Sequence, residues 1–290
     1  AAGTVDVLDI QVDPASFATT QMVMALATNY SALNGGPATV ITTKYGGAQW
    51  DATVNDESLP GVAASVLQYG SMWLPDDFSS SRATGLMRVF AGVATDNIAG
   101  TGLGDVFLAS FDAPAAAPSA ATDLNIRGAA TTTEVTSLGG TGAGASAVLM
   151  ASGFDRSTAA TSVVPLVYRS TAGGYTWLKH TKGPTGGATP FVYNGVNPAV
   201  SHLLVIDSTT ALIGTQGAAG ADNAVSLSID GGKIWNAVSL VNETNASIDD
   251  LELSPNLFMA VSGASNDSIW RLDGTQWTRV FSGSTFANAT

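Results

Sequence analysis

The sequence predicts an all-β protein, and three observations support that prediction. No window of about 11 to 18 residues carries an uninterrupted helical pattern of apolar positions. Short runs rich in β-branched and aromatic residues recur instead, joined by turns that contain glycine. The 290 residues are 45% hydrophobic and 12% charged, which is typical of a chain that folds around a core. We therefore expect one large globular domain built from strands.

Four hairpins can be identified because two β-rich runs flank a glycine turn, and the second run usually carries a tryptophan. Their paired runs are Ala38–Tyr45 with Gln49–Val54, Val163–Ser170 with Tyr175–His180, Ala224–Ile229 with Lys233–Leu240, and Ser268–Leu272 with Gln276–Phe281. A fifth unit, Met87–Val93 followed by Asp105–Ser110, lacks the tryptophan.

An apolar run that can supply an inner strand precedes each of the four hairpins: Met22–Ala27, Ala147–Ser152, Ala211–Gly214 and Leu257–Val261. A short turn lies just ahead of several of these runs, and proline occurs in three such turns, at Pro14, Pro75 and Pro255. Because proline ends a strand, we interpret these turns as crossings from one sheet to the next.

The spacing of the tryptophans gives the repeat. Trp50 and Trp177 are 127 residues apart, Trp177 and Trp235 are 58 apart, and Trp235 and Trp277 are 42 apart. A period of about 40 to 65 residues with four short strands predicts a β-propeller with four-stranded antiparallel blades. We expect five blades, at roughly residues 13–73, 74–138, 139–206, 207–253 and 254–290.

The alternating run Val5–Val12 stands before the first predicted blade, and the last blade lacks a clear fourth strand. We therefore expect residues 5–12 to complete the last blade and close the ring, which would hide the sheet edge. The alternative is that the chain is a fragment of a longer propeller.

The turn sequences resemble the Asp-box of the BNR repeat, Ser-x-Asp-x-Gly-x-Thr-Trp. The fullest match has Ser228, Asp230, Gly232 and Trp235, with Ile234 as its departure. The second match has Ser170, Gly174, Thr176 and Trp177, with Ala172 in place of the aspartate; shorter matches have Thr43, Gly47 and Trp50, and Asp273 and Trp277. This resemblance implies a propeller similar to sialidase-like and sortilin-like proteins, here a non-catalytic member.

The box residues suit a structural role. Glycine permits the positive φ of a tight hairpin, the serine and aspartate oxygens can bond the turn's backbone, and the tryptophan buries apolar surface. The turn with Ala172 should therefore lack hydrogen bonding worth about 1 kcal/mol.

We expect no catalytic site. The resemblance implies that an active sialidase would need three clustered arginines, a tyrosine–glutamate pair and an aspartic acid, but the Arg-Ile-Pro signature is missing. Nothing in the sequence places three of the seven arginines together. The pairs Asp76-Asp77 and Asp249-Asp250 are adjacent in sequence and do not form a facing glycosidase dyad by themselves.

We expect no cofactor other than, at most, a calcium ion, for which Asp76, Asp77, Asp249 and Asp250 are the candidate ligands. The histidines His180 and His202 have no metal-ligand spacing. With 23 acidic and 11 basic residues, the chain lacks the basic surface that nucleic acid requires. No apolar run approaches the roughly 18 to 20 residues of a membrane span.

The start at Ala1-Ala2-Gly3 and the scarcity of lysine are typical of a mature secreted or cell-surface protein. Cysteine is absent. In that setting five Asn-x-Ser/Thr triplets are glycan acceptor candidates or chance occurrences: Asn29, Asn242, Asn245, Asn266 and Asn288.

These observations favour a non-enzymatic extracellular propeller that assembles with itself, as an S-layer-like lattice or filament subunit, or binds other cell-surface components. The alternative is a secreted propeller that binds carbohydrate or hydrolyses glycosides.

Overall fold

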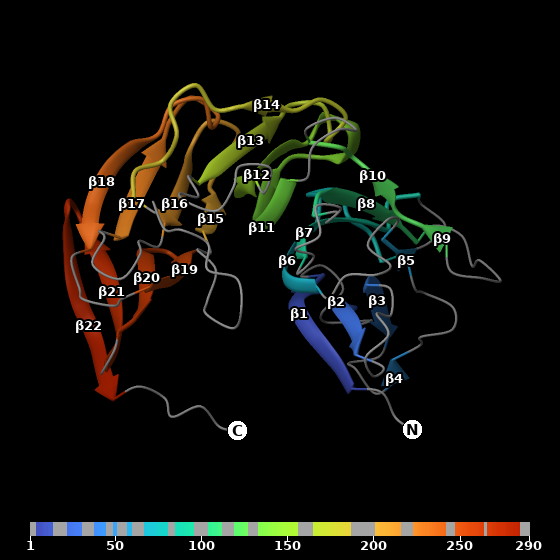
Figure 1. Cartoon of the computed structure of the whole chain (residues 1–290), viewed down its shortest axis with the longest axis horizontal. Helices are drawn as coiled ribbons and strands as arrows, with labels where there is room; N and C mark the ends of the chain where they lie inside the picture. Colours follow the sequence, from blue (N-terminus) through green and yellow to red (C-terminus); the bar gives the residue numbers. More distant parts are fainter. Residues whose placement is uncertain are drawn as a thin grey trace. The chain divides into compact units, whose positions relative to one another are not determined.

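The computed structural model describes residues 4–13, 22–30, 38–44, 49–50, 57–59, 67–80, 85–95, 104–111, 119–126, 133–155, 165–186, 201–215, 223–241, 247–263 and 266–284. These residues are almost entirely strand, which confirms the all-β prediction (Figure 1). The one helical element among them is the 3₁₀ turn η2, Gly144–Ser146. No helix in the described part of the chain has the length and apolar character needed to cross a membrane.

The described strands form five sheets. The first has the order β1-β2-β3-β5-β9, with β4 also paired to β3; its strands are β1 (Thr4–Val12), β2 (Val23–Tyr30), β3 (Ala38–Lys44), β4 (Gln49–Trp50), β5 (Glu57–Ser58) and β9 (Ser119–Ala120). The second has the order β10-β8-β7-β6, with β6 (Leu67–Trp73), β7 (Arg88–Thr95), β8 (Val106–Ser110) and β10 (Thr122–Asp123).

The other three sheets each keep their four strands in chain order. The third contains β11 (Thr133–Thr141), β12 (Val148–Asp155), β13 (Leu166–Ser170) and β14 (Leu178–Lys179). The fourth contains β15 (Ser201–Val205), β16 (Ala211–Thr215), β17 (Asn223–Ser228) and β18 (Asn236–Val241). The fifth contains β19 (Ser247–Leu253), β20 (Leu257–Ser262), β21 (Asn266–Asp273) and β22 (Gln276–Ser284).

The predicted hairpins and inner strands are confirmed by the pairing. Strand β3 pairs with β4, β17 with β18 and β21 with β22, all antiparallel, and the third sheet places β13 beside β14. The predicted inner strands are β2, β12, β16 and β20, each beside the first strand of its hairpin.

The structure corrects the predicted position of the N-terminal strand. Strand β1 pairs with β2 along its length, from Thr4 opposite Tyr30 to Val12 opposite Val23. It therefore belongs to the first sheet and does not complete the last one, and the last sheet takes its fourth strand, β22, from its own segment. Closure of a ring by residues 5–12 as an added strand is wrong.

The same correction shifts the expected blade boundaries. The second to fifth sheets begin one strand earlier than predicted, with β6, β11, β15 or β19. Strands β6, β15 and β19 lie at the ends of the preceding predicted blades, and β11 crosses the predicted boundary at 138/139. The turns at Pro75 and Pro255, which the sequence analysis interprets as crossings, each join two neighbouring strands of one sheet, and Pro14 lies outside the described residues. The Asp13 amide donates to the Met22 carbonyl at 3.1 Å, and the Ser254 amide donates to the Asn256 carbonyl at 2.9 Å. Pro75 and Pro255 fit their turns because a turn has positions whose N–H is not needed by the ladder.

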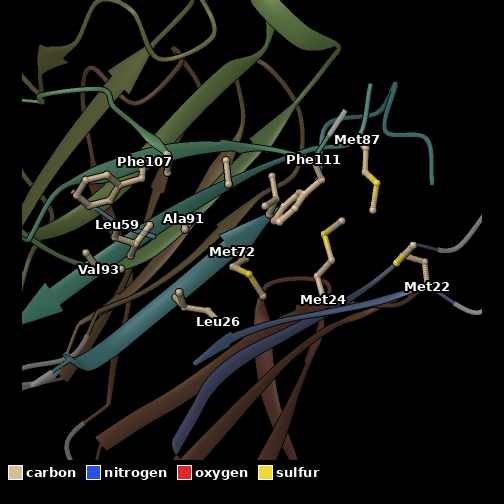
Figure 2. Packing of buried hydrophobic residues seen from close by; sticks show 13 residues of the cluster. Met22, Met24, Leu26, Leu59, Met72, Met87, Ala91, Val93, Phe107 and Phe111 are labelled. Carbon is tan, nitrogen blue, oxygen red and sulfur yellow. The ribbon is translucent and has the colours of Figure 1, made fainter. Parts of the chain in front are cut away.

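The chain divides into two compact units. The first contains Ala1–Ala151, Asp155–Ser157 and Ser170–Leu178, and the second contains Ser152–Phe154, Thr158–Arg169 and Lys179–Thr290. The core of the first unit is a cluster of methionine, leucine, valine and phenylalanine side chains, contributed chiefly by β2, β6, β7 and β8 (Figure 2). Met24 and Leu26 from β2 lie in the same cluster as Met72 from β6 and Phe107 from β8.

Neighbouring sheets within each unit approach closely at glycine. A Cβ on Gly92 of β7 would lie 2.5 Å from Val135 of β11, and one on Gly70 of β6 would lie 2.3 Å from Leu26 of β2. In the second unit a Cβ on Gly214 of β16 would lie 2.6 Å from Ile248 of β19. An alanine at any of these positions would require the facing leucine, valine or isoleucine side chain to shift, so glycine makes room for that side chain.

Candidate functional site

The candidate site is the set of Asp-box turns, and the turn between β17 and β18 is the most complete. The Ser228 hydroxyl donates to Asp230 Oδ1 at 2.8 Å and accepts the Gly232 amide at 3.0 Å. The same Asp230 oxygen accepts the amides of Lys233 at 3.1 Å and Ile234 at 3.0 Å. Gly231 and Gly232 have φ values of 74° and 81°, a region that favours glycine. These contacts stabilise the turn from within.

Burial has the largest single effect on the Asp230 carboxyl and raises its pKa. The hydrogen bonds from Ile234, Ser228 and Lys233, with the positive charge of Lys233, outweigh it, so the pKa lies below its ordinary value. The carboxylate is therefore ionised at neutral pH and acts as a hydrogen-bond acceptor for the turn.

Trp235 anchors this turn in the second unit. Its side chain is 0% exposed, and its indole Nε1 donates to the Gly232 carbonyl at 3.1 Å. Its amide donates to the Lys182 carbonyl at 3.2 Å, while the Thr181 amide donates to the Lys233 carbonyl at 2.8 Å. The Gly231 amide donates to Thr209 at 2.8 Å. The turn thus joins its own sheet to the segment after β14 and to the turn between β15 and β16.

The turn between β13 and β14 shows what the missing aspartate changes. The Ser170 hydroxyl accepts the amides of Gly174 at 3.0 Å and Ala172 at 3.3 Å, as Ser228 does for Gly232 in the complete turn. Ala172 offers no carboxylate, and the Tyr175 amide donates to the Ala172 carbonyl at 3.2 Å. The buried Trp177 Nε1 has no hydrogen-bond partner among the described residues. This turn keeps the fold of the box but is less fully bonded.

Substituting Ala172→Asp should therefore stabilise the protein. The new carboxylate would stand where it can accept from Ser170 and from the amides of Tyr175 and Thr176, three and four residues on, as Asp230 does. We expect the free energy of unfolding to rise by about 1 kcal/mol, measured by urea denaturation. The matched control, Asp230→Ala, should lower it by about 1 to 3 kcal/mol. A loss of stability in A172D would show that the two turns are not equivalent.

Of the two shorter boxes, the Asp273–Trp277 turn is fully described and the Thr43–Trp50 turn is described in part. Thr43 pairs with Trp50 across β3 and β4, and Gly47 lies outside the described residues. Asp273 pairs with Gln276 across the β21–β22 turn, and its carboxylate accepts from Arg271 Nε at 2.8 Å. That bond from Arg271 is the main cause of the lowered pKa of Asp273. Trp277 packs against the apolar core of the second unit. The described box residues therefore lie in paired strands of one sheet.

The structure places three of the four acidic candidates at backbone amides and the fourth, Asp249, at a serine hydroxyl. Asp76 accepts the Gly142 amide at 2.7 Å, and Asp77 accepts the Gly144 amide at 3.0 Å and lies 3.3 Å from Arg88. These bonds attach the β6–β7 turn to the β11–β12 turn of the next sheet. Asp249 accepts from the Ser262 hydroxyl, and Asp250 accepts the Leu251 amide at 2.8 Å. Within the described ranges no group of three or more His, Cys, Asp or Glu side chains is arranged to hold a metal ion.

Two histidines and one triplet can also be placed. Burial lowers the pKa of His202 despite the nearby charges of Asp250 and Asp249. Burial likewise lowers the pKa of His180, whose Nδ1 lies 3.1 Å from the Val167 amide.

Asn266 is exposed at the start of β21, whereas Ser268 of the same triplet is buried and accepts the Trp270 indole N–H at 2.9 Å. Asn29 lies in β2, and Asn242, Asn245 and Asn288 fall outside the described residues.

Three of the described arginines are engaged locally. Arg88 lies beside Asp77, Arg271 beside Asp273, and Arg279 lies over the Trp270 ring with its guanidinium carbon 5.6 Å from the centroid. Arg169 carries a buried Nε without a hydrogen-bond partner among the described residues. Arg82, Arg127 and Arg156 lie outside the described part of the chain.

Two carboxylates that sequence reasoning missed join structural elements. Asp9 of β1 accepts the Met72 amide of β6 at 2.5 Å, and burial raises its pKa. Asp105, just before β8, accepts the amides of Val106 at 2.7 Å and Ile126 at 2.9 Å. Burial is the main cause that raises the pKa of Asp105 to about 6, and the charge of Asp123 adds to it. Neither residue lies in a recurrent motif, so no signal in the sequence marked it.

Comparison with solved structures shows the fold. No family model and no curated protein sequence matches the chain. Trypanosoma rangeli sialidase aligns over 91% of this chain and 47% of its own, with 13% identity and a TM-score of 0.54. The Hadza microbial sialidase Hz136 aligns over 91% of this chain and 56% of its own, with 11% identity and a TM-score of 0.50. The chain therefore spans about half the length of these sialidases, and it has a sialidase-like β-propeller fold.

Proposed function

We propose that this protein is a non-enzymatic, self-assembling structural subunit of a secreted or cell-surface layer or filament. The observation that carries this proposal is the exposure of large apolar side chains on several of the described strands. Val7 and Ile10 of β1 are 50% and 53% exposed, and Val238 and Leu240 of β18 are 54% and 59% exposed. Exposed apolar surface of this kind is typical of a site that binds protein.

We further propose that the five sheets are the blades of a propeller and that the Asp-box turns are its structural joints. The support is the repeated pattern of sheet packing at Gly70, Gly92 and Gly214, and the bonding of the turns at Ser170 and Ser228. Such a role needs rigid turns, and the described box residues bond mainly to backbone atoms of their own turns and neighbouring segments.

The hydrogen bonds that the described carboxylates accept support a non-enzymatic role. Asp76, Asp77, Asp105 and Asp230 all accept backbone amides at 2.7 to 3.1 Å, which leaves them as structural acceptors. A glycosidase would need a facing pair of carboxyl groups, one of them held as an acid. A carbohydrate-binding or glycoside-hydrolysing propeller is the second candidate, since sialidases share this fold.

Sedimentation velocity of the full chain over a wide concentration range tests the proposal. We expect the mean mass to rise with concentration, with calcium present or chelated. A chain that stays monomeric throughout would contradict self-assembly. Binding or turnover in a screen of glycans and aryl glycosides by that monomer would then support the carbohydrate alternative.

A further inference from the structure

The last strand of the fourth sheet, β18, has an edge that no other strand covers in the described part of the chain. It stands at the end of the sheet order β15-β16-β17-β18. Its six residues, Asn236–Val241, include no charged residue, no proline and no glycine. The side chains of Val238 and Leu240 are 54% and 59% exposed. Such an edge presents unpaired backbone N–H and C=O groups, together with apolar side chains, to another strand.

The last strands of other sheets are protected against such pairing. Strands β10 and β14, which end the second and third sheets, are each only two residues long. Strand β22, which ends the fifth sheet, carries the charged Arg279. Short length and charged side chains both discourage pairing with another chain. Strand β18 has neither protection, and its one irregularity is a bulge that leaves Val238 without a partner in β17.

The chain itself adds a segment to the beginning of this edge. Lys182 forms a parallel bridge with Ile234, just before β18. The Lys182 amide donates to the Lys233 carbonyl at 3.2 Å, and the Trp235 amide donates to the Lys182 carbonyl at 3.2 Å. Pro184 follows in the sequence and has no N–H with which to extend the pairing. The edge can therefore accept an extended segment, and the six residues of β18 are left for another occupant.

Positive charge gathers at the beginning of this edge, although the chain as a whole is acidic. The sequence has a net charge of −12 and only four lysines. Three of them, Lys179, Lys182 and Lys233, lie in the segments that meet just before β18, and all three are exposed. The Lys182 Nζ donates to Asn236 Oδ1, in the first residue of β18, at 2.7 Å. A second copy of this acidic chain is therefore attracted to this part of the surface.

We infer that β18 pairs antiparallel with β18 of a second copy of this chain, about a two-fold axis at the middle of the strand. An uncharged edge pairs with itself without placing like charges side by side, and the exposed Val238 and Leu240 of both copies become covered. Antiparallel pairing sets Lys233 of the two copies roughly 35 Å apart, well beyond the screening length of salt. Parallel pairing would place these two lysines side by side.

This inference rests on the proposed self-assembly and specifies one of its interfaces. A two-fold contact uses the same surface on both copies, so by itself it closes as a dimer. The dimer is then the unit from which a layer or filament is built through other surfaces.

Charges introduced at Val238 test the two-fold arrangement. Val238 lies near the middle of β18, so its side chains in the two copies meet near the axis. We expect Val238→Lys and Val238→Glu, each alone, to associate about tenfold or more weakly than the wild type in sedimentation velocity, because like charges then face each other. An equimolar mixture of the two variants should restore association, because opposite charges then face each other. Circular dichroism checks that each variant folds.

Ile229→Lys is the matched control, since Ile229 is 71% exposed in a turn of the same sheet and lies off the β18 edge. We expect I229K to associate like the wild type. Association of V238K and V238E like that of I229K would overturn the inference and leave the proposed function standing. A mixture that associates no better than each variant alone would also overturn it.

The wild type separates the inference from the proposed function. A wild type that forms a dimer and nothing larger, with V238K monomeric at the same concentration, would support the β18 contact and contradict a layer or filament. A wild type that stays monomeric at every concentration would overturn both.

Discussion

Replacing Trp235 by alanine should lower the free energy of unfolding by about 3 to 5 kcal/mol. The side chain is completely buried, and its indole nitrogen donates to the Gly232 carbonyl. Truncation removes this apolar surface and leaves the carbonyl without its partner in a buried turn. Urea denaturation followed by far-ultraviolet circular dichroism measures the change without relying on tryptophan fluorescence.

Trp177→Ala is the control for this prediction. Trp177 occupies the same place in the turn of the third sheet, but it is half-buried and its indole nitrogen has no partner among the described residues. We expect its replacement to cost clearly less than that of Trp235. Equal losses would show that burial and the indole hydrogen bond do not determine the strength of an Asp-box joint.

The second large effect is a pH dependence of stability that originates at Asp105. Its pKa is raised from 3.8 to about 6 in the folded protein, chiefly because the carboxyl is buried. The folded state therefore binds the proton more tightly than the unfolded state does. The stabilising contribution of the protonated Asp105 carboxyl is fully present below about pH 4 and is lost as the pH rises through 6. A difference of about two pKa units corresponds to about 3 kcal/mol.

Asp105→Asn removes this titration and keeps an oxygen that can accept the amides of Val106 and Ile126. We expect D105N to be more stable than the wild type at pH 8 and to lose most of this advantage by pH 4. Urea denaturation at several pH values between 4 and 8 gives the difference directly. A difference that stays constant with pH would contradict the assignment. Asp123→Asn is a useful comparison, because removing the Asp123 charge should lower the pKa of Asp105.

Local sequence patterns were enough to predict the hairpins. The pairs β17–β18 and β21–β22 are joined by glycine turns with positive φ at Gly231, Gly232 and Gly274, and glycine in a short turn between apolar runs predicts such a hairpin. The second strands, such as β16 with the sequence Ala-Leu-Ile-Gly-Thr, were predictable because a short apolar run between turns is typical of a buried strand.

The grouping of strands into sheets was less predictable. Strands β15 and β19 have mixed sequences, Ser-His-Leu-Leu-Val and Ser-Ile-Asp-Asp-Leu-Glu-Leu, and a bulge interrupts the alternation of β19. A proline turn has the same sequence whether it joins two strands of one sheet or leads to the next sheet. Pairing between distant segments decides between these possibilities, and a single sequence does not display it.

The Asp-box turns were predictable as a motif, whereas the links between elements were not. Ser228, Asp230 and Gly232 lie within five residues of one another, and their bonds close inside that turn. Asp9 bonds to Met72, and Asp76 bonds to Gly142, across 63 and 66 residues. Such contacts depend on how the sheets are stacked, so they follow from the tertiary structure and leave no local pattern.

Self-assembly of the chain is the central claim, and electron microscopy of the purified full chain tests it most directly. We expect ordered filaments, tubes or sheets from the wild type, with calcium or with a chelator. Isolated particles from the wild type at every concentration would contradict the claim.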